Sequence, residues 1–337
     1  MKILVTGGAG FIGSHLARAL VEGGASVVIL DNLFTGRDKN MTEFILAEDP
    51  VVRVEFIQGD VRDRNTVQSI IKNVDEVYHL AAAVGVELVE DNPIYTMEAN
   101  VRGTWVVTQA CLEAKKRLFF ASSSEVYGRG DFTLEERQSS IFGTEMRFCY
   151  AASKLLGEFY IRAACREFGL RAVIGRYFNV VGPGQTSAHG HVLPRFCEQA
   201  LRGEPLTVYW TGTQTRTFTW VGDAVVATMR LMDRLRNGGA VSGEVFNIGS
   251  NNQIGILTLA KMIIKATGGK SEVKLELDKP MCGIFSRGPN RQKLKEAIGY
   301  APETWIDKIV DWTLAWHKEK MGKVDVTISN KKTTETV

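Results

Sequence analysis

The chain has 337 residues, of which 45% are hydrophobic and 23% charged, as is usual for a soluble globular protein with a sizeable core. Its 41 Lys and Arg against 38 Asp and Glu leave a formal charge of +3, which argues against nucleic acid or an anionic membrane as the main partner. The sequence shows no apolar run long enough to span a bilayer, no signal-peptide pattern and no C-x-x-C among its five scattered cysteines. We therefore expect a cytoplasmic protein that holds no metal and no disulfide.

Short apolar runs alternate with amphipathic stretches through the first half of the chain. The runs that predict strands are Ile3–Thr6, Val27–Asp31, Val54–Gln58, Glu76–Leu80, Leu118–Ser122 and Ala172–Tyr177. The stretches that predict helices are Phe11–Glu22, Asn65–Lys72, Ile94–Ala114 and Tyr150–Phe168. This alternation predicts the α/β class, with a doubly wound parallel sheet of the Rossmann type over residues 1–178.

The pattern becomes less regular after Asn179. Gly and Pro interrupt residues 181–190, Leu193–Arg202 predicts a helix, and Leu206–Tyr209 predicts a short strand. We expect a smaller substrate-binding domain over residues 179–320, with the chain partly returning to the sheet. A doubly wound sheet binds its ligands at the carboxyl edge, where this domain would lie. Residues 323–337 are polar and predicted to be disordered.

A glycine-rich turn, from Gly7 to Gly13, joins the first predicted strand to the first predicted helix. Side chains at Gly7 and Gly10 would block the turn and the approach of a pyrophosphate, and one at Gly13 would hold the helix off the sheet. Asp31 ends the second strand, where it can accept hydrogen bonds from the adenosine ribose and would repel a 2′-phosphate. The pattern predicts NAD rather than NADP, with Asp60 positioned near adenine.

Tyr150 and Lys154 are four residues apart in a predicted helix, so they share one face. A neighbouring ammonium favours phenolate, and we expect Lys154 and the positive nicotinamide together to lower the pKa of Tyr150 towards working pH. Tyr150 can then take the proton of a sugar hydroxyl while NAD takes hydride from the same carbon. The Ser-rich segment 122–128 ends the fifth predicted strand, where a hydroxyl can share the substrate's hydrogen bond with Tyr150.

These motifs resemble, in order and spacing, those of the extended short-chain dehydrogenases, the nucleotide-sugar epimerase/dehydratase family. The resemblance runs from Lys2 to about Lys318 and includes the glycine turn, Asp31-Asn32-Leu33, His79-Leu80-Ala81-Ala82, Asn100, the Ser-rich segment, Tyr150 and Lys154, Arg176-Tyr177-Phe178-Asn179 and Gln214-Thr215-Arg216. It implies that Ser123 is the catalytic hydroxyl and that Ser124 lines the pocket. It also implies a tightly held NAD that is reduced and reoxidised within one turnover.

The resemblance implies two sets of binding residues and a partner. The expected NAD contacts are Gly7, Gly10, Phe11, Ile12, Gly13, Asp31, Asn32, Thr35, Gly36, Asp60, Val61, Leu80, Ala81, Ala82, Asn100, Tyr150, Lys154 and Tyr177. The expected contacts to a nucleotide sugar, with UDP favoured, are Gly85, Ser124, Asn179, Val192, Leu193, Arg195, Thr207, Tyr209, Arg216 and Arg287. Of these, Asn179, Arg216 and Arg287 would hold the diphosphate, for which Arg offers a fork of charged donors. Family members commonly form a homodimer through two long helices, here Ile94–Ala114 and Tyr150–Phe168.

The reaction that follows oxidation at sugar carbon 4 depends on neighbouring residues. Return of hydride to the other face gives a 4-epimerase for a UDP-hexose or UDP-hexuronate, and it needs no further acid or base. Glu125 favours a 4,6-dehydratase or a UDP-glucuronate decarboxylase, since Ser-Glu-Val-Tyr-Gly resembles those enzymes.

Two other positions disfavour these lyases. Gly184 stands where uronate-handling relatives usually have Arg, although Arg195 or His191 can replace that cation. Ser124 occupies the place of a second acid in many dehydratases. We therefore rank the 4-epimerase first and the lyases second, ahead of a non-catalytic NAD-binding sensor and an NADP-dependent keto-sugar reductase.

Overall fold

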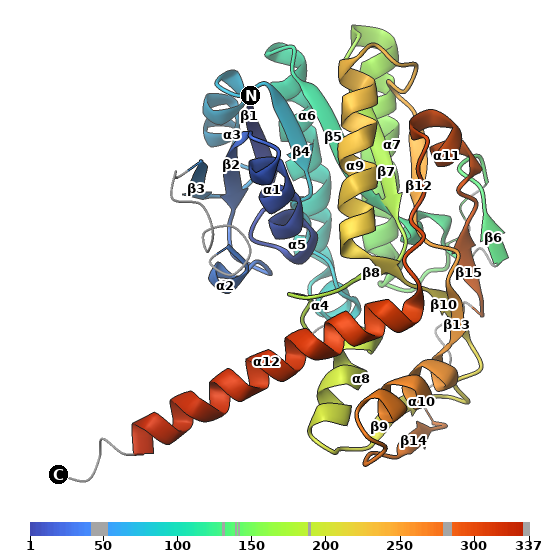
Figure 1. Ribbon diagram of the computed structural model, residues 1–337. Helices are drawn as coiled ribbons and strands as arrows, with labels where there is room; N and C mark the ends of the chain where they lie inside the picture. The colour runs from blue at the N-terminus through green and yellow to red at the C-terminus, as the bar shows by residue number, and fades with distance from the viewer. Residues whose placement is uncertain are drawn as a thin grey trace.

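A seven-stranded parallel sheet forms the centre of the molecule, in the order β12-β7-β5-β4-β1-β2-β3 (Figure 1). The computed structural model describes residues 1–41, 53–129, 132–138, 140, 142–187, 190–278 and 285–332. The sheet strands are β1 Lys2–Thr6, β2 Ser26–Asp31, β3 Val54–Gln58, β4 Glu76–His79, β5 Arg117–Ser123, β7 Ala172–Tyr177 and β12 Val245–Ile248. The six strands predicted from the sequence are each confirmed to within one residue, and so is the doubly wound α/β class.

Helices cover both faces of this sheet, because successive strand residues point to opposite sides. Phe119 packs with α1 Phe11–Glu22 and α9 Val221–Arg236 on one face. Phe120, its neighbour in β5, packs with α3 Arg64–Lys72, α6 Gly103–Glu113 and α7 Phe148–Phe168 on the other face. Burial on both sides explains the apolar runs in β1, β2 and β5, whereas the edge strand β3 is mostly exposed.

The stretch predicted as one helix over Ile94–Ala114 is divided into three parts. It comprises α5 Pro93–Met97, a π-helical turn Glu98–Arg102 and α6. Asn100 lies in the π-helical turn, and such turns often occur at functional sites. The apolar spacing predicts the length of this segment but not the wide turn inside it.

The second half of the chain adds smaller elements at the carboxyl edge of the sheet. α8 Val192–Leu201, β9 Leu206–Tyr209 and α10 Ile256–Ala266 share a separate hydrophobic core. The remaining short elements are α2 Asp38–Met41, α4 Val86–Asp91, the 3-10 turn Ser124–Tyr127, β6 Phe132–Leu134, β8 Val180–Val181, β10 Thr215–Thr217, β11 Thr219–Trp220, β13 Gln253–Gly255, β14 Val273–Glu276, β15 Arg287–Pro289 and α11 Gln292–Ile298. β12 brings the chain back to the central sheet beside β7. The domain boundary between residues 178 and 179 stays a proposal.

The last helix, α12 Ile306–Lys332, extends from the body of the molecule to its C-terminal end (Figure 1). The sequence predicts disorder from residue 323, whereas the helix continues through Lys332. No Pro or Gly follows Gly322 to end it. Residues 333–337 of the predicted tail, and Cys282, lie outside the described residues. Within the part of the chain that the structure describes, no helix is both long and apolar enough to cross a bilayer.

Candidate functional site

The glycine turn after β1 leaves room for a phosphate next to the backbone. Gly7 has a φ of +73°, and a Cβ there would lie 2.6 Å from the Ala81 nitrogen. A Cβ at Gly13 would lie 2.1 Å from the Gly7 carbonyl oxygen, so the close contact that requires this glycine is with the turn itself. At Gly10 a Cβ would meet only that same oxygen, at 3.1 Å. The open space at Gly10, at the start of α1, fits a pyrophosphate held by helix N-terminal amides.

Asp31 lies at the end of β2, largely buried beside this turn. Its Oδ2 accepts a hydrogen bond from the Ala9 amide at 3.0 Å, and its Oδ1 accepts one from the Leu33 amide at 2.9 Å. Burial raises the pKa of Asp31, while these two bonds act in the opposite direction. Each oxygen keeps a second lone pair for a ribose hydroxyl. A Cβ at Gly36 would lie 2.7 Å from Oδ1, so the loop after β2 also requires glycine.

Two other expected NAD contacts, Asn100 and Tyr177, are held by hydrogen bonds within the protein. Asn100 bonds the Ala83 amide at 2.8 Å and the Ser153 hydroxyl at 3.1 Å, so it ties the loop after β4 to α7. The Tyr177 hydroxyl hydrogen-bonds Thr228 at 2.6 Å inside the core. The Tyr177 side chain therefore points into the core, because β7 is covered on that face by α9, and its expected contact with NAD stays a prediction for its main chain.

Ser123, Tyr150 and Lys154 come together at the carboxyl end of β5. The Ser123 hydroxyl accepts a hydrogen bond from the Glu125 amide at 3.2 Å and also hydrogen-bonds Tyr150. Lys154 lies one helical turn beyond Tyr150 and is buried. Its ammonium donates to the Ala121 carbonyl at 2.8 Å and lies 4.9 Å above the Phe120 ring. The expected hydroxyl, phenol and ammonium thus share one site.

The protein alone does not lower the pKa of Tyr150. Burial raises that pKa to about 12, and the Glu125 charge adds to the rise, while the hydrogen bond with Ser123 opposes it. Burial also lowers the pKa of Lys154 to about 7, with the Glu158 charge opposing. In the protein alone desolvation decides the pKa of Tyr150, and the expected joint effect of Lys154 and a bound nicotinamide stays a prediction. A positive nicotinamide, when bound, adds the charge that favours phenolate.

A buried ionic network behind the site is absent from the sequence-based prediction. Glu158 and Arg176 form an ion pair with 2.6 Å between Oε2 and Nη2, with side chains only 3% and 7% exposed. The Ser122 hydroxyl donates to the same carboxylate, and the Arg176 guanidinium lies 4.7 Å above the Tyr127 ring. A glutamate four residues after Lys154 in a helix is the signal that points to it. The network holds α7 against β5 and β7.

Glu125 and Arg287, expected in separate roles, form an ion pair. Arg287 Nη1 donates to Glu125 Oε1 at 2.6 Å, and Nη2 donates to the Gly128 carbonyl. Arg287 is 3% exposed and Glu125 39%. Arg287 Nε has no partner within the described residues. Arg287 was expected to hold the diphosphate of the substrate. In the structure its guanidinium binds Glu125 instead, because β15 pairs with β6.

The expected nucleotide-binding residues lie on β9, β10 and α8. Arg195 donates to the Tyr209 hydroxyl at 2.9 Å and to the Thr207 carbonyl at 3.1 Å, so these three expected residues are neighbours. Leu193 is fully buried in the core between these elements, so only its main chain is available to a ligand. Two other expected substrate contacts donate to main-chain oxygens. Asn179 Nδ2 donates to the Thr217 carbonyl at 2.9 Å, and Arg216 Nη1 donates to the Thr215 carbonyl at 2.7 Å.

The remaining predicted residues lie close to the same edge. Gly85, with a φ of 121°, precedes α4, Val192 opens α8, and Ser124 is buried after β5. Asp60 follows β3, but its carboxylate is bound by Arg62 and Asn32. The N-cap of α3 is Asp63, whose side chain accepts from the Asn65 and Thr66 amides.

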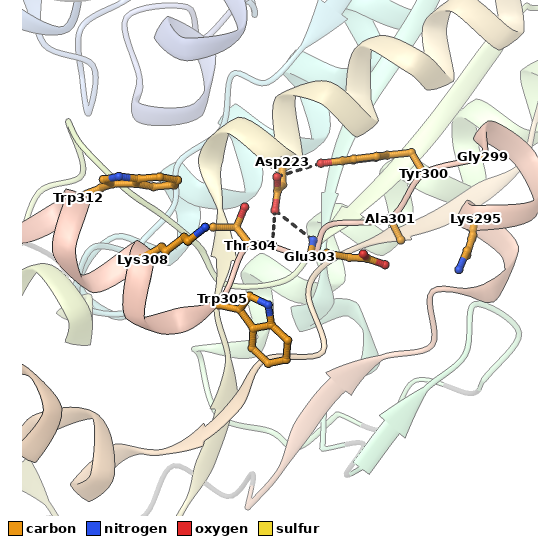
Figure 2. Close-up of a pocket in the computed structure, with 10 residues that line it drawn as sticks. All are labelled: Asp223, Lys295, Gly299, Tyr300, Ala301, Glu303, Thr304, Trp305, Lys308 and Trp312. Atoms are coloured by element: carbon orange, nitrogen blue, oxygen red, sulfur yellow. Dashed lines mark hydrogen bonds between the residues drawn. The ribbon is translucent and has the colours of Figure 1, made fainter.

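A surface hollow of about 490 Å³ lies elsewhere, where α12 begins (Figure 2). At its centre Asp223 accepts hydrogen bonds from the Tyr300 hydroxyl at 2.9 Å and from the Thr304 amide, also at 2.9 Å. These bonds tie α9 to the segment before α12. None of the predicted site residues lines this hollow.

Comparison with known proteins agrees with the family that the sequence resembles. The profile of the NAD-dependent epimerase/dehydratase family matches residues 3–249. The UDP-N-acetyl-alpha-D-glucosaminuronate decarboxylase of Bacillus cytotoxicus is 37% identical, over 94% of this chain and 98% of its own length. UDP-glucuronic acid decarboxylase 1 of Xenopus tropicalis is 33% identical, over 95% and 73% respectively.

Two solved structures share the fold over nearly the whole chain. The UDP-glucose 4-epimerase of Thermotoga maritima, solved with UDP-glucose, has a TM-score of 0.85 at 27% identity and covers 95% of this chain and 100% of its own. The UDP-glucuronic acid 4-epimerase of Bacillus cereus, solved with UDP-glucuronic acid and NAD, has a TM-score of 0.83 at 28% identity, over 95% and 99%.

Proposed function

The chain belongs to the NAD-dependent epimerase/dehydratase family, and we propose that it decarboxylates a UDP-hexuronate after transient oxidation at sugar carbon 4. The curated relatives at 33% and 37% identity are UDP-uronate decarboxylases. The solved 4-epimerases are less similar in sequence, at 27% and 28%. These identities favour the decarboxylase, which the sequence alone ranks second.

The observation that carries the proposal is the carboxylate of Glu125 beside Ser123. Its main-chain nitrogen bonds the Ser123 hydroxyl, and its side chain is partly open to solvent while Arg287 holds one oxygen. A 4-epimerase needs no carboxylate at this point, since its hydride is only taken and returned. A decarboxylase must deliver a proton to carbon 5 after carbon dioxide leaves, and Glu125 can relay one from solvent.

Each residue then has a role in a balanced reaction. NAD, when bound, accepts hydride from carbon 4 and later returns it. Tyr150 takes the proton of the 4-hydroxyl, Ser123 shares that hydrogen bond, and Lys154 orients the cofactor's ribose. The bond from carbon 5 to the carboxylate breaks, its electron pair enters the carbon 4 carbonyl as an enolate, and carbon dioxide departs. Tyr150 and Ser123 donate hydrogen bonds to the enolate oxygen, and Glu125 passes a proton to carbon 5.

A second candidate, a UDP-hexose 4-epimerase, is favoured by Gly184. This position lacks the arginine expected for a uronate carboxylate, and Arg195 is bound to Tyr209 and Thr207. His191 precedes α8, with Nδ1 3.2 Å from the Thr186 carbonyl. A hexose has no carboxylate for such an arginine to hold, so the absence of the arginine fits this epimerase.

Glu125→Gln separates the two reactions, because glutamine keeps the size of glutamate but cannot carry a proton. With UDP-glucuronate in a single turnover, we expect the variant to oxidise carbon 4, retain reduced nicotinamide absorbance and release the decarboxylated sugar nucleotide at least about a hundredfold more slowly, because protonation of carbon 5 is blocked. Glu90→Gln, an exposed glutamate on α4, is the matched control and should behave as wild type. Unaltered turnover in Glu125→Gln, with a product of unchanged mass from the wild type, would support the epimerase instead.

We also propose a homodimer formed through α6 and α7. Trp105 on α6 is 43% exposed, and Leu156 and Phe159 on α7 are 49% and 58% exposed. Large apolar side chains on neighbouring helices are costly to leave in water and are enriched at the core of dimer interfaces. This face agrees with the two helices named from the sequence.

A further inference from the structure

Tyr95 joins two loops at the edge of the sheet where the adenosine half of NAD is expected. β2 and β3 are parallel neighbours with Asp31 opposite Gln58, so the residues that follow them share one edge. Asn32 follows β2 and Asp60 follows β3, whereas Tyr95 is on α5. In a doubly wound sheet this edge holds the adenosine.

The Tyr95 hydroxyl is bound from the loop after β2. Asn32 Nδ2 lies 3.3 Å from the Tyr95 hydroxyl and 3.2 Å from Asp60 Oδ2, so one amide reaches both groups. The Phe34 ring, about half exposed, lies 4.3 Å from the Tyr95 ring in a tilted arrangement. Two side chains of one loop therefore contact one tyrosine.

The Tyr95 ring is also covered from the loop after β3. The Arg62 guanidinium lies 5.0 Å from the ring centre, within the range of a cation–π contact. The same guanidinium donates to both oxygens of Asp60, at 2.9 and 2.8 Å, which fixes its plane. Tyr95 thus connects Asn32, Phe34 and Arg62 across the edge.

We infer that Tyr95 is a cofactor-retaining residue: it clasps the loops after β2 and β3 over the adenosine of NAD and slows NAD dissociation. An enzyme that reduces and reoxidises one NAD in each turnover has no need to release it. The clasp contacts no reacting atom, so it acts on the residence time of NAD and leaves hydride transfer unchanged. The inference rests on NAD binding and not on which sugar reaction follows, so it can fail independently of the proposed function.

The test measures dissociation of NADH, whose fluorescence changes on release, during a chase with excess NAD and without any sugar nucleotide. Tyr95→Ala removes the hydrogen bond and both ring contacts, and we expect NADH to dissociate about 10- to 100-fold faster. Tyr95→Phe keeps the ring contacts and should accelerate dissociation by less than about tenfold. Arg62→Met removes the cation above the ring together with two hydrogen bonds to Asp60, and it should also accelerate dissociation.

Ile94→Ala is the control, because this neighbour on α5 is 77% exposed and takes no part in the clasp. Its NADH dissociation rate should equal that of the wild type. An unchanged dissociation rate in Tyr95→Ala would overturn the inference, as would a faster association rate alone, which would mean that Tyr95 blocks the adenosine site. If Tyr95→Ala does not fold, Tyr95→Phe and Arg62→Met decide the question by the same rates.

Discussion

Replacing Glu158 tests whether the buried network behind the site supports catalysis as well as stability. Glu158→Gln leaves the Arg176 guanidinium, 7% exposed and doubly bound to that carboxylate, without a compensating charge. Breaking a buried pair from one side costs about 3–5 kcal/mol, and the glutamine oxygen can still accept one bond, so we expect the lower end, about 3 kcal/mol. Urea unfolding measures this free energy.

The same substitution has an effect on the site itself. The Glu158 charge raises the pKa of Lys154 against the effect of burial, so Glu158→Gln should lower that pKa below its value of about 7. Less Lys154 is then charged at neutral pH, and the pH above which kcat/KM falls should move down. The double variant Glu158→Leu with Arg176→Met removes both charges and should regain stability but not the pH profile.

Glu22→Gln is the control for these measurements, since its ion pair with Arg18 is exposed on both sides. We expect it to change the free energy of unfolding by less than about 1 kcal/mol. The reasoning is refuted if Glu158→Gln and Glu22→Gln lose the same stability, or if the pH profile of Glu158→Gln matches that of the wild type.

Four further substitutions test other parts of the site. Tyr150→Phe should lower turnover by about a thousandfold while NAD content stays normal, and near-normal turnover would remove Tyr150 from the mechanism. Asp31→Ala should weaken NAD binding and reduce the preference for NAD over NADP in binding titrations. A wild-type protein that already prefers NADP would contradict the role given to Asp31. Lys154→Met concerns pH: folded Lys154, with a pKa of about 7, holds fewer protons than the unfolded chain up to about pH 10.5, so it makes stability rise with pH in that window. In Lys154→Met the free energy of unfolding should therefore rise less steeply with pH, by up to about 1.4 kcal/mol per pH unit. Equal slopes in the variant and the wild type would count against the lowered pKa of Lys154. Phe159→Glu should convert the dimer to monomers in light scattering, whereas an unchanged mass would exclude this face of α7.

The fold was predictable because its signals are local. Apolar runs of four to six residues predict parallel strands, and the run at Ala172–Tyr177 coincides with β7. The glycine turn followed by Asp31 predicts the cofactor edge, since a Cβ at Gly7 or Gly13 would collide with backbone and Gly10 leaves open space. The π-helical turn at Asn100 escaped prediction, because its cause is a contact to Ala83 and Ser153 from elsewhere in the chain.

The sequence predicted which residues lie at the site better than it predicted which of them bind one another. Ser123, Tyr150 and Lys154 meet because a strand end and a helix face bring them together. The ion pair of Glu125 with Arg287 spans 162 positions in the sequence, and only the pairing of β15 with β6 brings it about. Burial likewise decides the pKa of Tyr150, and spacing along a helix carries no information about desolvation.

The mass of the product tests the central claim most directly. The wild-type protein, with the NAD that it holds, is incubated separately with UDP-glucuronate, UDP-N-acetylglucosaminuronate and UDP-glucose, and the sugar nucleotides are weighed by mass spectrometry. We predict that a uronate substrate is converted to a product lighter by one carbon dioxide, while UDP-glucose is left unchanged. A product of the same mass but different configuration, or one lighter by a water, would contradict the account.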